Sequence, residues 1–247
     1  MDRPAHIEVS NLSMAYGDFV VQRGIDFRVR QGDVFVIMGG NGCGKTTLMR
    51  ALIGLQRPAA GTVRYNGEDL WGVAQEDQER MKRRLGILFQ GGALWSSLTL
   101  AENVALPLAE YTGLPLGRVA EIVSFKLALV GLAGFEDFCP SELSGGMKKR
   151  AGLARAMALD PEILYFYEPS SGLDPLSARL LDELILELRD SLGTTVVVVS
   201  HELASIFAIG DRAVFLDAEA KTRLAVGDPR VLRDSSPAPR VRKFLSR

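Results

Sequence analysis

The sequence has few cysteines, no long apolar run and almost no net charge, and each of these features excludes a class of protein. Only two cysteines occur in 247 residues, Cys43 and Cys139, and they lie far apart. We therefore do not expect a disulfide-stabilised secreted fold, and we expect a reduced cytoplasmic setting. The longest apolar runs, such as residues 196–199, are far too short to cross a bilayer. A net charge of −1 offers no basic field for nucleic acid or an anionic membrane.

The chain also lacks a secretion signal, internal repeats and low-complexity linkers. Residues 1–6 do not show the basic-then-apolar pattern of a signal peptide. Apolar residues make up 47% of the sequence and charged residues 24%, which is ordinary for a soluble globular protein. The length suffices for one large domain with a substantial core. We therefore expect a single domain over residues 1–247, and any membrane role to come through a partner.

Three apolar runs without polar alternation predict strands of a parallel sheet. They are residues 34–38, 163–167 and 195–199, all rich in β-branched or aromatic side chains, as expected for strands buried on both faces. Between such runs lie segments of helical period, for example residues 180–188. Strands that alternate with helices in this way indicate an α/β fold.

Two further parts of the chain have a different pattern. Residues 7–9 and 27–29 predict short antiparallel strands, and residues 62–67 are expected to pair with them and to turn at Asn66-Gly67. Residues from about 92 to 159 are mostly helical in pattern. They interrupt the series of buried strands, so we expect an inserted helical subdomain.

A glycine-rich loop follows the first buried strand and fits the pattern G-x-x-x-x-G-K-T. Glycines let backbone N–H groups converge on phosphate oxygens, and the following helix adds partial positive charge. Lys45 is expected to reach the β- and γ-phosphates, and the Thr46 hydroxyl to bind Mg²⁺. The alternative is a glycine-rich turn without a ligand. The residues expected to contact nucleotide here are Gly39, Gly40, Asn41, Gly42, Cys43, Gly44, Lys45, Thr46 and Thr47.

A second motif, Leu143-Ser144-Gly145-Gly146-Met147, precedes a helical run. Alone it is typical of a helix N-cap, with Ser144 as the cap. Together with the first loop, it makes nearly the whole chain resemble the ATP-binding subunits of ABC transporters, whose signature LSGGQ has Gln where Met147 stands. The resemblance implies a P-loop NTPase with a RecA-like core, an antiparallel β-subdomain and a helical subdomain. It also implies a head-to-tail dimer, in which Ser144, Gly145 and Gly146 of one copy close over ATP held by the other.

Other positions match the family one by one. Tyr16 resembles the aromatic residue that stacks on adenine, although an early Tyr is otherwise a core or turn residue. Gln90 resembles the glutamine that senses Mg²⁺ and the attacking water, with a solvated turn residue as the alternative. Glu168 resembles the general base, although an acid at a strand end is also often a cap. Asp174 ends the stretch 171–174, which resembles the loop that couples the two sites of the dimer. His201 resembles the histidine that contacts the γ-phosphate, and its place after a buried strand outweighs a structural role.

Tyr167 departs from the family pattern, which has the Mg²⁺-organising Asp directly before the catalytic Glu. A phenol cannot supply the charge of a carboxylate to a hydrated metal, although Thr46, Gln90 and the phosphates could still hold Mg²⁺. We therefore expect ATP binding with impaired Mg²⁺-dependent turnover. Asp and Tyr codons differ by one nucleotide, so a point variant is the alternative to a functional feature.

Residues 89–104, 140–142 and 239–245 resemble in particular the Mce/Mla-type lipid-transport ATPases. That resemblance implies a homodimeric motor at the cytoplasmic face of the inner membrane, working with a membrane permease and a lipid-binding Mce-domain protein to move phospholipid or another hydrophobic substrate. Residues 91–95 would form part of the groove for a permease helix. The alternative for Leu94 and Trp95 is a place in the core of the helical subdomain.

Three other functions remain open. The first is transport of a different substrate, such as an amino acid, a metal or a drug, by the same architecture. The second is a non-transport ATPase acting on ribosomes or DNA, which usually has two cassettes or a long coiled-coil insertion. The sequence has neither feature and no basic surface signal, so no nucleic-acid partner is expected. The third is a degenerate subunit that binds ATP structurally, because Tyr167 replaces the usual acid.

Overall fold

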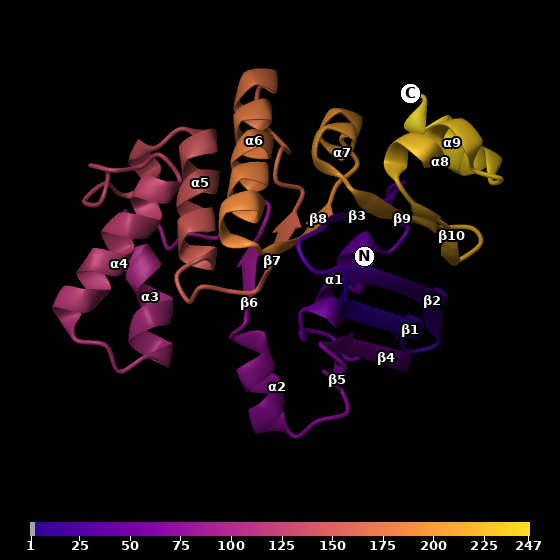
Figure 1. The fold of residues 1–247 in the computed structure, drawn as a ribbon, viewed down its shortest axis with the longest axis horizontal. Coiled ribbons are helices and arrows are strands. Elements are labelled where there is room, and N and C mark those ends of the chain that lie inside the picture. The colour runs from indigo at the N-terminus through magenta and orange to yellow at the C-terminus, as the bar shows by residue number, and fades with distance from the viewer. Residues whose placement is uncertain (1–2) are drawn as a thin grey trace.

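The computed structural model describes residues 3–247, and a six-stranded sheet forms the centre of this part of the chain (Figure 1). The strand order is β10-β9-β3-β8-β7-β6. All neighbours pair in parallel except β10, which is antiparallel to β9. Every residue of β3 and β8 is buried, which confirms the prediction from the continuous apolar runs. The strands are β3 (Val34–Gly39), β6 (Leu85–Leu88), β7 (Ile163–Tyr167), β8 (Thr195–Val199), β9 (Arg212–Asp217) and β10 (Thr222–Gly227).

A second sheet is antiparallel, with the order β2-β1-β4-β5. Its strands are β1 (Ala5–Tyr16), β2 (Phe19–Arg30), β4 (Ala60–Tyr65) and β5 (Glu68–Asp69). Asn66 and Gly67 have φ of 49° and 86°, which fits the predicted hairpin turn. At 12 residues each, β1 and β2 are longer than the short strands that the sequence predicted. A bulge at Asn11, where φ is 47°, shifts the alternation of buried residues and hid the second half of β1.

Helices cover both faces of the central sheet. They are α1 (Lys45–Leu52), α2 (Gln75–Lys82), α3 (Leu100–Tyr111), α4 (Leu116–Leu129), the 3₁₀ turn η1 (Pro140–Glu142), α5 (Gly145–Ala156), α6 (Pro175–Leu192), α7 (Leu203–Ile209), α8 (Pro229–Ser235) and α9 (Pro239–Leu245). The expected helical segment contains α3, α4, η1 and α5, which gather at the left of Figure 1.

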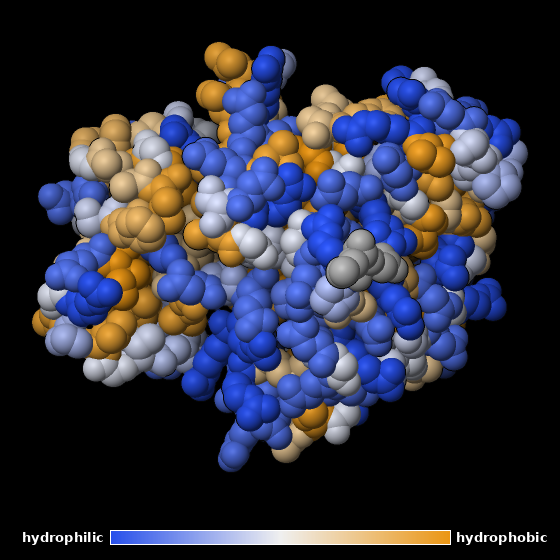
Figure 2. All heavy atoms as spheres, in the orientation of Figure 1, coloured by the Kyte–Doolittle hydropathy of each residue, from blue (hydrophilic) through white to orange (hydrophobic). Residues whose placement is uncertain are grey.

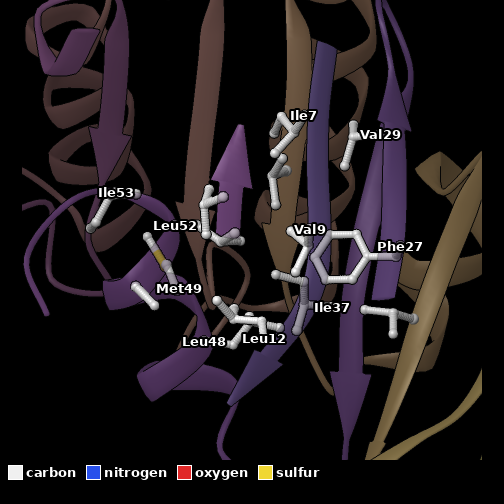
Figure 3. Packing of buried hydrophobic residues seen from close by; sticks show 14 of the residues in the cluster. Ile7, Val9, Leu12, Phe27, Val29, Ile37, Leu48, Met49, Leu52 and Ile53 are labelled. Atoms are coloured by element: carbon white, nitrogen blue, oxygen red, sulfur yellow. The ribbon is translucent and has the colours of Figure 1, made fainter. Parts of the chain in front are cut away.

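Three apolar clusters hold these layers together. One lies between the antiparallel sheet, α1 and one face of the central sheet, with Val9 and Phe27 facing Ile37, and with Leu48 and Leu52 of α1 beside them (Figure 3). A second joins the opposite face of the central sheet to α3, α4, α5 and α6, and a third joins β3 and β9 to α7, α8 and α9. Each cluster removes much apolar surface from water, which is the main stabilising term in a domain of this size.

The topology brings three chain segments to one edge of the sheet. Strands β3, β8 and β7 are parallel neighbours, so their carboxyl ends lie side by side. Gly39 ends β3, Glu168 directly follows β7, and His201 lies two residues beyond β8. Because ligands of such sheets bind at the carboxyl ends of the strands, this edge is the place for a site.

Candidate nucleotide-binding site

The phosphate loop leaves β3 and enters α1 in a conformation that needs glycine. Gly39 has φ of 150°, and a Cβ there would lie 2.4 Å from the Leu216 carbonyl oxygen. Gly44 caps α1 with φ of 91°. The Lys45 Nζ donates to the carbonyl oxygens of Gly39 and Gly40, at 2.9 and 3.1 Å, so the ammonium group lies against the loop. This is the backbone cradle with one fixed cation that the motif predicts.

Tyr16 lies beside this loop, at the end of β1. Half of the residue is exposed, and its hydroxyl donates to Gln56 Oε1 at 2.9 Å. Hydrogen bonding to Thr47 of α1 lowers the pKa of Tyr16. The exposure argues against the core role that was the alternative for this residue. An exposed ring held next to a phosphate loop offers a face on which a base can stack.

Glu168 and His201 form a pair across the ends of β7 and β8. The imidazole Nδ1 lies 2.8 Å from Glu168 Oε1, and Glu168 is buried while His201 is partly exposed. The second carboxylate oxygen, Oε2, has no hydrogen-bond partner among the described residues. Glu168 also has φ of 48°, a conformation that costs a non-glycine residue about 1–2 kcal/mol. Oε2 is buried, and a buried carboxylate oxygen is costly to leave unpaired, so a bound water molecule is a suitable partner for it.

Tyr167, the residue before Glu168, contacts the phosphate loop itself. Its hydroxyl lies 2.6 Å from Thr46 Oγ1, at the start of α1, and its ring packs against the cluster beneath α1. The Thr46 hydroxyl is the side chain expected to bind the metal. Tyr167, which stands where the family has an Asp, is therefore hydrogen-bonded to Thr46, a predicted metal ligand.

The loops after β6 and β7 also touch. Gln90 Nε2 donates to Ser171 Oγ at 3.1 Å, in an exposed hydrogen bond between the two loops. Asp174 caps α6 and accepts from the backbone N–H groups of Leu176 and Ser177. These bonds, and above all the one from the Ser177 hydroxyl, hold the pKa of Asp174 below its usual value. The described residues contain no cluster of three or more His, Cys, Asp or Glu side chains that could hold a metal.

The signature motif has the geometry of a helix cap but an excess of glycine. Ser144 Oγ accepts from Met147 N at 3.3 Å and caps α5. Gly145 and Gly146 occupy the first turn, where glycine is less favourable than alanine by about 0.5–1 kcal/mol. A Cβ at either position would meet nothing closer than 3.8 Å. Among the described residues, no contact calls for glycine at these two positions.

Lys149 is a site residue that the sequence reasoning missed. It is buried, and its Nζ donates to the carbonyl oxygens of Pro169 and Ser171. Burial lowers the pKa of Lys149. The lysine ties the signature helix to the loop that follows Glu168. The available signal was its helical position, four residues before buried Leu153 and so on the inward face.

The segment after Gln90 is clamped by two more residues that the sequence reasoning missed. Buried Asn103 exchanges hydrogen bonds with the backbone of Trp95, and Arg155 donates to the carbonyl oxygens of Gly92 and Ala93. Trp95 is 62% exposed, which excludes the core role that was its alternative. Leu94 packs against the core of the helical subdomain, which was the alternative interpretation for this residue.

A pocket of about 640 Å³ opens beside this segment, between α2, β6, α3 and α5. Its lining includes Leu85, Ile87, Pro107 and Arg155. The Arg83 guanidinium stacks over the ring of Tyr111 at its mouth, 4.9 Å from the centroid. The pocket is thus partly apolar, and its charged lining has both signs, with Lys82, Arg83 and Arg155 beside Glu79 and Glu110.

Comparison with known proteins agrees with this geometry. A sequence profile described as ABC transporter matches residues 22–171. The chain is 40% identical to the intermembrane phospholipid transport system ATP-binding protein MlaF of Haemophilus influenzae, over 97% of this chain and 89% of that protein. It is 37% identical to the probable ribonucleotide transport ATP-binding protein mkl of Mycobacterium tuberculosis, over 97% of this chain and 66% of that protein.

Solved structures share the fold. The dimeric structure of an ATP-binding cassette in a post-hydrolysis state, bound to ADP and Pi, superposes with a TM-score of 0.80 at 25% identity, covering 90% of this chain and 98% of that chain. CbiO1 from Clostridium perfringens gives a TM-score of 0.84 at 24% identity, with full coverage of both chains. The phosphate loop, the signature helix and these similarities lead to one conclusion: the chain belongs to the ABC transporter family, as an ATP-binding subunit.

Proposed function

We propose that this chain is the ATP-hydrolysing motor of a transporter that moves phospholipid or another hydrophobic substrate across the cell envelope. The observation that carries the substrate class is the 40% identity to MlaF over 97% of the chain. The observation that carries the motor is the Glu168–His201 pair, which lies at the sheet edge that also holds the phosphate loop.

Hydrolysis would proceed by in-line attack of water on the γ-phosphate. Glu168 orients the water through its free oxygen, and His201 holds both that carboxylate and the phosphate. Lys45 stabilises the charge on the phosphoryl oxygens, and Tyr16 stacks on adenine. The gain comes from placing water and phosphate in line, together with fixed positive charge where negative charge develops.

Thr46 and Gln90 are the residues that would hold Mg²⁺. Both offer neutral side-chain oxygens, which are ligands that Mg²⁺ accepts when phosphates supply the negative charge. The fit is therefore to a metal that arrives with its nucleotide and not to a free ion. Bound in this way, Mg²⁺ supplies positive charge to the β- and γ-phosphates.

A second copy of the chain would complete each site, with Ser144, Gly145 and Gly146 against the γ-phosphate held by its partner. The unneeded glycines of α5 support this arrangement, since they leave a bare helix start for a phosphate to approach. Asp174 and the loop around it would join the two sites. The fold is shared with cassettes solved as dimers, which supports the same assembly here.

A helix of a membrane permease is the occupant proposed for the pocket between α2, β6, α3 and α5, which Arg155 links to the segment that carries Trp95. Within residues 3–247, no helix is both long and apolar enough to span a membrane. Apolar side chains of α3 and α4 reach the surface around this side of the molecule, where Figure 2 shows apolar patches. The lining mixes Lys82, Arg83 and Arg155 with Glu79 and Glu110, so it offers charged partners of both signs to the ends of a short helix. Asn103 fixes the backbone of Trp95, whose side chain is exposed, so less backbone ordering is needed on binding.

Purification of the complex from membranes tests this function. The chain should co-purify with an integral membrane permease and an Mce-domain protein, at the cytoplasmic face of the inner membrane, and the complex should contain bound phospholipid. Trp95→Glu should release the permease while leaving ATP binding intact, with the exposed Phe19→Glu on β2 as the matched control. A periplasmic solute-binding protein or ribosomal particles in place of the Mce-domain protein would contradict the proposal, and bound ribonucleotide would favour the alternative suggested by mkl.

A further inference from the structure

Tyr167 is held rigidly at the phosphate side of the site. Its hydroxyl is 2.6 Å from Thr46 Oγ1, and its ring is packed against the apolar cluster under α1. Two residues earlier on the same strand, the Tyr165 hydroxyl bonds to that of Tyr65, which donates to the Leu52 carbonyl oxygen. Tyrosines thus fix α1 at both ends, the start through Tyr167 and the end through Tyr65. The Tyr167 hydroxyl therefore cannot swing away from the phosphate loop without losing packing.

The donors and acceptors of the Thr46 and Tyr167 hydroxyls limit which ligand groups the pair can bind. The two hydroxyls lie 2.6 Å apart and share one hydrogen bond, in which either oxygen can be the donor, so one O–H of the pair remains free. When the Thr46 oxygen faces a metal, its own O–H points to the Tyr167 oxygen. The Tyr167 O–H then remains as a donor. A carboxylate at this position would have only acceptor oxygens.

Donors and acceptors select different partners at this point. Water molecules bound to Mg²⁺ present hydrogens, so they suit a carboxylate and not a second donor. Phosphate oxygens accept, so they suit the phenol. A phenol at position 167 also lacks the charge that would repel a polyphosphate with no metal bound.

We propose that the Tyr167 hydroxyl donates to a phosphate oxygen of the bound nucleotide, and that this chain consequently holds ATP with little dependence on Mg²⁺. The proposal deepens the nucleotide site assigned above and rests on ATP binding there. It does not depend on the transported substrate or on the permease.

Calorimetric titration of the purified chain with ATP, in excess Mg²⁺ and in EDTA, tests the proposal. For the wild type, the two dissociation constants should agree within about threefold, because the donor replaces part of the metal's role. Tyr167→Asp should weaken binding in EDTA by about tenfold or more, and Mg²⁺ should restore it, because the carboxylate repels bare phosphates and accepts from metal-bound water. Tyr167→Phe should weaken binding about tenfold in both conditions, because a bond to a charged acceptor is lost.

Manganese provides a readout that is independent of turnover. Electron paramagnetic resonance should show weaker Mn²⁺ binding, with a non-hydrolysable ATP analogue present, for the wild type than for Tyr167→Asp. Equal Mn²⁺ affinities of the wild type and Tyr167→Asp would overturn the proposal. A wild type whose affinity for ATP falls tenfold in EDTA would also overturn it. If Tyr167→Asp does not fold, as judged by circular dichroism, Tyr167→Phe decides, because unchanged affinity in EDTA would also overturn it. A wild type that binds no ATP in Mg²⁺ would instead refute the nucleotide site itself.

Discussion

Two neighbouring residues at the end of β7 belong to different parts of the site: Glu168, with His201, to a hydrolytic half, and Tyr167, with Thr46, to a metal half. Glu168 is a buried carboxylate in a strained conformation, pinned by His201, and it matches the family pattern. Tyr167 is a phenol bonded to Thr46, and it departs from that pattern. Glu168 lies just beyond β7 and has a left-handed φ, and the two side chains contact different partners, His201 for Glu168 and Thr46 for Tyr167. One half can change while the other keeps its geometry.

The largest expected effect separates the two halves directly. Glu168→Gln removes the charge that orients the attacking water but keeps the size of the side chain. Phosphate release by the assembled complex should fall by at least about 100-fold, while the affinity for ATP should change little. A Gln variant that keeps a tenth or more of the wild-type rate would mean that the hydrolytic half lies elsewhere.

The next effect tests whether the hydrolytic half is complete in one chain. Gly146→Asp should fold normally, because a Cβ there meets only Ser177 at 3.8 Å. The added carboxylate would face the γ-phosphate of the partner, so ATP-dependent dimers of the chain should be lost in light scattering. Gly146→Ala is the control and should retain them in part. Dimers of unchanged stability in the Asp variant would argue against the sandwich.

The smallest effect compares Glu168 with another buried carboxylate. Asp182 of α6 also has an oxygen without a partner among the described residues, and burial raises its pKa. Its contribution to stability is fully present below the unfolded pKa and is lost as the pH rises through the raised folded pKa. Asp182→Asn should therefore stabilise the protein by about 1 kcal/mol at neutral pH. Urea unfolding at several pH values checks this, and a gain that persists at low pH would contradict it.

The sequence predicted those features that depend on local pattern. The apolar runs identified the buried strands β3, β7 and β8 but not β6, β9 or β10, and the two glycine motifs identified the loops that carry Lys45 and Ser144. Features that depend on contacts between residues far apart in the sequence were not predicted. The contact of Tyr167 with Thr46 joins residues 121 positions apart, and its presence follows from the register of β7 against α1. Lys149 and Asn103 escaped for a related reason, because a buried polar residue is defined by the backbone groups that surround it.

The most direct test of the divided site is the Mg²⁺-dependent ATPase rate of the assembled complex with Tyr167→Asp. The substitution supplies the missing charge to the metal half and leaves Glu168 and His201 in place. The account predicts a rate about tenfold above that of the wild type, from about 1.4 kcal/mol of added stabilisation in the transition state. Tyr167→Phe, which adds no charge, should show no such gain. Equal rates for the wild type and Tyr167→Asp would contradict the account.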